Sequence, residues 1–182
     1  IYCHHHKSQD ELLVVRFGEC VLAAEQVQEV ISTEAIRWSI SISSLSEVDT
    51  KQKRQHVIIL QTGTKTLRDL DEADFTNIQN LLLNSTNLIW VYRNDTPDFQ
   101  MIVGLVRSLR SETAAHIATL GLGAEDLGKP AGPILAAIKA LWPADGSVKP
   151  CTDFEFKTQN GQLMVPRIMD DNALNTFVRK ET

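Results

Sequence analysis

The sequence predicts an α/β protein that is built on a doubly wound, mostly parallel sheet. Short apolar runs rich in β-branched residues alternate with segments that carry an amphipathic helical pattern. Right-handed crossovers between such strands place helices on both faces of the sheet. The 182 residues suffice for one domain with a sizeable core. We therefore expect a truncated Rossmann-like domain, with a C-terminal hairpin at Asn160-Gly161.

The first elements of the chain build one half of this sheet. Leu12–Phe17 is an apolar run typical of a buried strand, and after Gly18 a helix is expected from about Glu19 to Ser32. Ala35–Ile42 alternates apolar and polar residues, which predicts a strand near a sheet edge. His56–Gln61 is a compact buried strand that follows without an intervening helix.

The middle of the chain contains the best-defined strand and helix pair. Asn87–Tyr92 is an apolar strand, and Pro97–Glu112 follows it with an apolar stripe whose polar positions gather towards the C-terminal end. Residues 62–70 are expected to form a loop. The next helix is expected to begin after Asp71 or Asp74, either of which can cap it, and to end near Asn84. Its expected buried residues are Phe75, Ile78, Leu81 and Leu82.

The last third of the chain predicts one more strand, one more helix and the hairpin. Ala115–Leu122 has the pattern of a buried strand, and Gly132-Pro133 opens a short helix over Ile134–Trp142. Two alternating runs flank Asn160-Gly161, the pair most typical of a two-residue hairpin turn. The expected order is strand, helix, strand, strand, helix, strand, helix, strand, helix and then the hairpin.

Composition narrows the functional class. The net charge of −5 without a basic stripe argues against a nucleic-acid surface, and no apolar run approaches the roughly 20 residues of a membrane helix. Three distant cysteines favour a reducing, cytoplasmic compartment over a disulfide scaffold. The N-terminal residues lack the apolar core of a signal peptide, and the first residue is not Met, so we expect a piece of a longer protein.

The loop after the first strand lacks the features of a dinucleotide site. Such a site needs glycines there, because they let backbone N–H groups approach the pyrophosphate. Gly18 is the one glycine in this loop, and Glu19 places a negative charge where a phosphate needs positive potential. Neither Tyr2 nor Tyr92 has a lysine three or four residues further on, and Tyr92 is expected to pack at a strand end. We therefore predict no bound cofactor and no catalytic residue in this chain.

Three further sets of residues are candidate sites in the sequence. Cys3–His6 contains zinc ligands, but adjacent residues cannot easily surround a tetrahedral ion, so a frayed terminus is favoured. Cys20 lies at an expected helix N-terminus without a nearby His or Asp partner, which argues against a reactive thiol. Arg107, Arg110 and Glu112 could form a phosphate-binding or acidic-partner patch. Pairing around the end of a helix is the favoured interpretation.

The second half of the chain resembles a known family. Trp90-Val91 lie towards the end of a buried strand, Gly104–Glu112 reads GLVRSLRSE, and Asn160–Arg167 reads NGQLMVPR. This combination resembles the pseudo-ketoreductase region, a structural ketoreductase subdomain, of fungal highly reducing polyketide synthases. Ile168–Asn175 resembles the lead into the enoyl reductase of such synthases. The similarity extends from about Leu12 onward, although the first half matches mainly in strand order.

The resemblance implies a non-catalytic subdomain that braces the catalytic ketoreductase of a reducing polyketide synthase. The enoyl reductase and methyltransferase regions are its other implied neighbours. NADPH and phosphopantetheine are implied for the parent synthase and not for this chain. The implied organisation is a linker at 1–11, the Rossmann-like domain at 12–168 and a linker toward the enoyl reductase at 169–182. The candidate structural or docking residues are Trp90, Gly104, Arg107, Arg110, Glu112, Pro166 and Arg167.

A second class of function is a small Rossmann-like protein or enzyme that binds a nucleotide or an acyl carrier. Ligands of such sheets bind at the carboxyl ends of the strands. The loops Arg93–Thr96 and Leu122–Lys129 would then form the site. The lack of further glycines and of basic residues at Phe17–Val21 argues against a phosphate-containing ligand.

Overall fold

The computed structural model describes residues 10–34, 38–112, 116–143 and 149–167. Its strands are β1 (Asp10–Arg16), β2 (Trp38–Ser44), β3 (Arg54–Gln61), β4 (Ser85–Arg93), β5 (His116–Leu122), β6 (Glu155–Gln159) and β7 (Gln162–Met164). Its helices are α1 (Val21–Glu34), α2 (Glu72–Asn84), α3 (Pro97–Glu112) and α4 (Ala131–Leu141), together with a short 3₁₀ turn, η1 (Leu67–Asp69). The order of strands and helices is the one that the sequence predicted.

The seven strands form one sheet in the order β2-β1-β3-β4-β5-β6-β7. Every neighbouring pair is parallel except β6 and β7, which are antiparallel. Strand β2 pairs with one side of β1, and β3 pairs with the other side, so the direction in which the sheet grows reverses at β1. In sheets of this kind the reversal marks the position where a ligand ordinarily binds.

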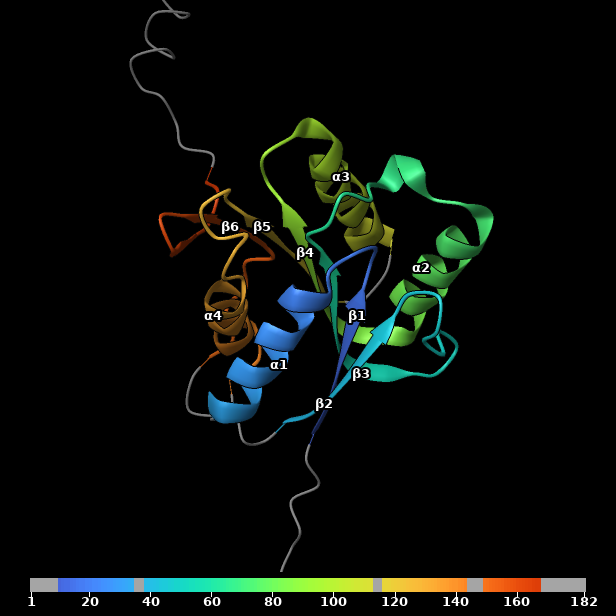
Figure 1. Ribbon diagram of the computed structural model, residues 1–182, viewed down its shortest axis with the longest axis horizontal. Coiled ribbons are helices and arrows are strands. Elements are labelled where there is room, and N and C mark those ends of the chain that lie inside the picture. The colour runs from blue at the N-terminus through green and yellow to red at the C-terminus, as the bar shows by residue number, and fades with distance from the viewer. Residues whose placement is uncertain (1–9, 35–37, 113–115, 144–148, 168–182) are drawn as a thin grey trace, which may run out of the picture.

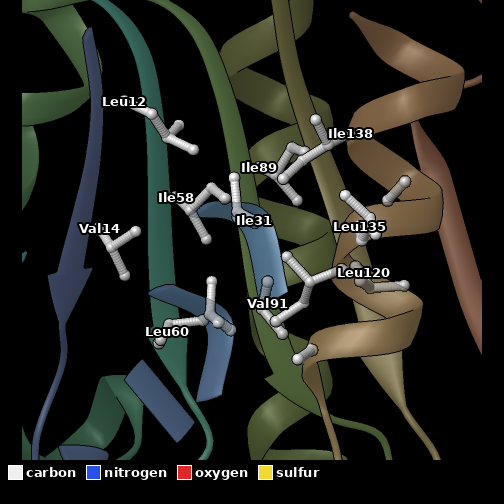
Figure 2. Close-up of a cluster of buried hydrophobic side chains, with 14 of the residues drawn as sticks. Leu12, Val14, Ile31, Ile58, Leu60, Ile89, Val91, Leu120, Leu135 and Ile138 are labelled. Atoms are coloured by element: carbon white, nitrogen blue, oxygen red, sulfur yellow. The ribbon is translucent and has the colours of Figure 1, made fainter. Parts of the chain in front are cut away.

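Helices cover both faces of the sheet and create two hydrophobic cores. Figure 1 shows α1 and α4 on one side of the sheet and α2 and α3 on the other. Alternate residues of each strand point to opposite faces, so Leu12 and Val14 of β1 enter one core, whereas Leu13 and Val15 enter the other. Figure 2 shows the first core, in which Ile31 of α1 and side chains of α4 pack on the central strands.

Local sequence signals account for the ends of several elements. The Asp71 side chain accepts a hydrogen bond from the backbone N–H of Asp74 and caps α2, which decides between the two predicted caps. Asn160 (φ +52°) and Gly161 (φ +74°) both lie in the left-handed region between β6 and β7. Two positive φ angles define a type I′ turn, so the predicted hairpin is confirmed.

The structure also corrects parts of the sequence interpretation. Phe75 was predicted to be buried in α2, but 57% of its surface is exposed, whereas Ile78, Leu81 and Leu82 are buried as expected. Residues 62–70 contain the turn η1, whose Thr66 and Asp69 form a capping box. Strand β1 begins at Asp10, two residues before the predicted start. The predictions for Cys3–His6 and for residues 169–182 lie outside the described residues.

Candidate functional site

The ligand position expected for this topology lies at the carboxyl ends of β1 and β3. In this chain the two loops that leave these strands contact each other directly. The backbone N–H of Phe17 donates to the carbonyl oxygen of Leu60 at 2.9 Å. A Cβ atom added at Gly63 would lie only 2.7 Å from the carbonyl oxygen of Glu19. The loop after β3 is therefore packed against the loop where a pyrophosphate would have to bind.

Cys20 closes the turn between β1 and α1 from the inside. Its side chain is 4% exposed, and its Sγ lies 3.4 Å from the carbonyl oxygen of Phe17 and 3.3 Å from that of Leu60. A thiol can donate to these carbonyl oxygens only while it keeps its proton. Cys20 is thus buried and held against the two carbonyl oxygens of the turn.

Polar and aromatic side chains fill the space beneath these loops. Gln61 is fully buried; its Oε1 accepts a hydrogen bond from Trp90 Nε1 at 2.9 Å, and its Nε2 donates to the carbonyl oxygen of Lys65 at 3.2 Å. The rings of Phe17 and Trp90 meet edge to face at 6.5 Å. The position at β1 where the sheet reverses its direction of growth is its switch point. We call the side chains that pack there the switch-point plug, which consists of Phe17, Cys20, Gln61, Lys65 and Trp90.

The lysine that packs beside the expected phosphate position is already paired. The ammonium group of Lys65 forms an ion pair with Asp74 of α2 and lies 5.7 Å from the centre of the Phe17 ring. The Lys65 side chain also packs on Gly18, because a Cβ atom added there would lie 3.0 Å from the Cβ of Lys65. Gly18 itself has φ +79°, so a glycine is required here for the turn.

A dinucleotide can be tested against this geometry. Its pyrophosphate needs open backbone N–H groups at the start of the first helix and positive potential beside them. Here the backbone of Gly63 and the side chain of Lys65 occupy that space, and Glu19 adds a negative charge. The residues at this position do not fit a dinucleotide.

A second cluster of charged residues joins α3 to β6. Arg107 donates from Nε and Nη2 to the two carboxylate oxygens of Glu155 at 2.8 and 2.6 Å. Arg110 donates to the same carboxylate at 2.5 Å and to the carbonyl oxygen of Phe154 at 3.2 Å. These hydrogen bonds, with that from Arg107 first, lower the pKa of Glu155 below its ordinary value.

This cluster shows which group the two arginines of the predicted patch contact. Arg107 and Arg110 both pair with Glu155 across the fold, so one carboxylate serves two guanidinium groups and the three side chains together keep one positive charge. Glu112, the third member of that predicted group, is exposed on the last turn of α3. Gly104 is exposed on the same helix, and a Cβ atom added there would meet no atom within 4 Å.

The predicted residues near the end of the described chain lie beside this cluster. Arg167 donates from two nitrogens to the carboxylate of Asp153 at 2.6 and 2.8 Å, which lowers the pKa of Asp153. Pro166 is exposed and lines two small cavities of about 290 and 380 Å³ that also contact Arg107 and Glu155. Trp90, by contrast, is fully buried in the switch-point plug.

The loops of the alternative ligand site carry carboxylates, and Asn94 Oδ1 and Asp126 Oδ2 in these loops are buried without a hydrogen-bond partner among the described residues. Arg93 pairs with Asp95, and its guanidinium lies 5.2 Å from the centre of the Phe99 ring. The Glu125 side chain accepts a hydrogen bond from the backbone N–H of Asn160 at 2.8 Å. An anionic ligand approaching these loops would meet Asp95 and Glu125, which opposes the binding of a nucleotide or a phosphopantetheine phosphate.

The described part of the chain holds neither a group of metal ligands nor a membrane-spanning helix. Within it, no three His, Cys, Asp or Glu residues are grouped so that they could hold a metal ion. No helix among the same residues is long and apolar enough to cross a bilayer.

The chain was compared with known proteins. The family described as HRPKS sdrA-like, NAD(P)-binding Rossmann-fold domain matches residues 20–169. This chain belongs to that family. The suspected resemblance to a domain of highly reducing polyketide synthases is thereby confirmed, as is the Rossmann-like fold. The family description names NAD(P), whereas the switch-point plug of this chain does not fit a dinucleotide.

Curated relatives are fungal reducing polyketide synthases. Highly-reducing polyketide synthase 1 of Aureobasidium melanogenum is 31% identical over 96% of the chain, which covers 8% of that synthase. Reducing polyketide synthase rads1 of Floropilus chiversii is 35% identical over 68% of the chain and 5% of the synthase. The highly reducing polyketide synthase curS1 of Aspergillus terreus is 32% identical over 68% of the chain and 5% of the synthase. The chain therefore corresponds to a small part of each relative.

Sequence reasoning missed Gln61, Gly63 and Lys65, which pack at the ligand position together with residues that follow β1 and with Trp90 of β4. A partial signal was present, because Gln61 is a polar residue at the end of an otherwise apolar strand. Glu155, which receives the predicted arginines, was also missed, since it lies 45 residues or more from them in the chain.

Proposed function

We propose that this chain is a non-catalytic structural subdomain of a multidomain highly reducing polyketide synthase and that it braces the catalytic ketoreductase. The switch-point plug carries this proposal. It replaces the open loop of a cofactor site with packed side chains and backbone, so the fold is kept while the site is lost. Structural roles suit such a domain, because its sheet and helices remain rigid and offer surfaces to neighbours.

The parent synthase supplies the chemistry in this proposal. It assembles a polyketide on a phosphopantetheine arm and reduces it with NADPH, and the ketoreductase binds that cofactor at its own site. The family membership and the names of the relatives support a synthase as the parent. The enoyl reductase and methyltransferase regions are the other proposed neighbours. The proposed borders are a linker at 1–11, the domain at 12–168 and a linker from 169, in a cytoplasmic enzyme.

The proposal is tested by the thermal stability of the ketoreductase. The catalytic ketoreductase domain of the same synthase is produced alone and together with this chain, and its Tm is measured by scanning calorimetry. A bracing interaction worth about 2 kcal/mol raises the Tm by roughly 4–8 °C for a domain of this size. An unrelated protein at the same concentration serves as the control. An unchanged Tm would reject the bracing role.

A further inference from the structure

An apolar groove lies on the outer surface of the α2 and α3 layer. It has a volume of about 660 Å³, and side chains of α2, α3 and the turn η1 line it. Three large apolar side chains at this groove are exposed to solvent: Phe75 by 57%, Met101 by 45% and Leu105 by 37%. Contiguous exposed apolar residues of this kind mark interaction surfaces on folded proteins.

The groove is acidic at one end. Asp71 and Glu72, at the N-terminus of α2, belong to its lining, and none of its lining residues is basic. Helix α2 contains two carboxylates and no Lys, Arg or His, and its Asp74 is already paired with Lys65. The nearby Arg68 forms an ion pair with Asp98 at 3.1 Å. Among the described residues no ion pair engages Glu72, so its charge is available to a cation from outside, and Asp71 adds negative charge beside it while one of its carboxylate oxygens caps α2.

From Met101 to Ser108 the groove side of α3 carries no charged side chain, and the exposed Glu112 follows one turn later. The exposed residues of this side are Met101, Gly104, Leu105 and Ser108, while Arg107 is held by Glu155. Glycine inside a helix costs about 1 kcal/mol relative to alanine, and the packing of the described residues does not require it at Gly104, where a Cβ atom would meet nothing within 4 Å. A glycine at this position lets an external backbone approach the helix closely.

We propose that this α2–α3 groove is the docking surface of the chain and that its occupant is an amphipathic helix of a neighbouring synthase domain. The apolar stripe of that helix fills the groove between Phe75 and Leu105, and a Lys or Arg side chain of the helix lies beside Asp71 and Glu72. A second copy of the chain is disfavoured as occupant, because the same face of that copy brings no basic lining residue. The inference deepens the proposed bracing function by naming the surface that carries it.

A model helix tests the groove independently of any ketoreductase. The probe is a fluorescent peptide of about 18 residues, long enough to form a helix, that presents leucines on one face and lysines on the other. A matched peptide carries glutamates in place of the lysines. Fluorescence anisotropy with the full chain is expected to show saturable binding of the lysine peptide, at least about 10-fold tighter than that of the glutamate peptide.

Variants locate the binding on the chain. Leu105→Asp and Phe75→Asp are expected to weaken the binding of the lysine peptide at least about 10-fold. Glu72→Lys is expected to reduce the salt dependence of that binding. Met164→Asp is the matched control, because Met164 is also 46% exposed but lies on β7, away from the groove. Circular dichroism melts check that each variant remains folded.

Three results would contradict the proposal that the groove binds a helix. The two peptides could bind with equal affinity, or Met164→Asp could weaken binding of the lysine peptide as much as Leu105→Asp does. The third result is that the chain forms a dimer and that Leu105→Asp dissociates it. The ketoreductase experiment separates this inference from the proposed function. If the Leu105→Asp chain still raises the Tm of the ketoreductase, the groove is not the docking surface, while the bracing role is retained. If the wild-type chain binds the lysine peptide as expected but leaves the ketoreductase unchanged, the bracing role is rejected and the groove is retained.

Discussion

At the residue scale, the carboxylate of Glu155 fixes β6 to the C-terminal half of α3. It accepts hydrogen bonds from Arg107 and Arg110 and is 23% exposed, so water screens it only in part. Charge-assisted hydrogen bonds of this kind are stronger than neutral ones. Arg110 is itself only 20% exposed and depends on Glu155 as its charged partner.

We expect Glu155→Gln to lower the free energy of unfolding by about 1–2 kcal/mol, because it takes the negative charge away from three hydrogen bonds that Arg107 and Arg110 donate. Arg107→Gln is the control and should cost less than about 1 kcal/mol, since its side chain is 63% exposed. Urea unfolding of the three proteins measures both effects. An equal cost for the two variants would show that Glu155 is not the central residue of the cluster.

The same carboxylate predicts an acid-dependent loss of stability. The pKa of Glu155 in the folded chain is lowered from an ordinary value of 4.5, chiefly by Arg107, and that of Asp153 is lowered by Arg167. A lowered folded pKa means that the stabilisation is present above the unfolded pKa and is lost as the pH falls through the folded pKa. Stability should therefore fall below about pH 4.5, and Glu155→Gln should make that fall shallower.

Tyr92 predicts a second, alkaline loss of stability. Burial, and to a smaller extent the charge of Glu155, raise the pKa of its hydroxyl from 10.0 to about 12. The folded chain keeps this proton more tightly than the unfolded chain does, so stability falls as the pH rises from about 10 to about 12. Tyr92→Phe should remove this part of the pH dependence. Identical alkaline profiles for the two proteins in urea unfolding would contradict the assignment.

At the scale of elements, α2 shows what the sequence pattern can and cannot predict. The apolar spacing predicted the helix and its buried residues Ile78, Leu81 and Leu82, because these face the sheet. Phe75 has a similar spacing but lies on the side of the helix that no other element of the described chain covers. Periodicity identifies apolar positions on a helix, yet it does not tell which of them the tertiary structure covers.

The cap of α2 provides a test at this scale. We expect Asp71→Ala to lower the free energy of unfolding by about 1 kcal/mol, because it leaves the backbone N–H of Asp74 without its partner. Asp71→Asn should retain most of the stability, since asparagine caps helices as well as aspartate does. Thermal melts followed by circular dichroism compare the two. A large loss with Asp71→Asn would mean that the charge, and not the cap, matters.

At the scale of the whole molecule, local sequence patterns predicted the order of strands and helices along the chain and the two layers of helices on the sheet. The sequence predicted only in part that the usual ligand position is closed. The single Gly18 and the acidic Glu19 predicted that a phosphate would bind poorly after β1. The contact of Gly63 with Glu19 and the burial of Gln61 against Trp90 join segments that are 29 to 44 residues apart, and no local pattern specifies them.

The central claim concerns this closed position, and titration of NADPH into the isolated chain tests it most directly. Isothermal calorimetry is performed on the chain and, under the same conditions, on a catalytically active ketoreductase. The plug formed by Phe17, Cys20, Gln61, Lys65 and Trp90 predicts saturable heat with the ketoreductase and none with the chain. Saturable binding of NADPH to the chain would mean that these side chains open a cofactor site, and it would contradict the proposed structural role.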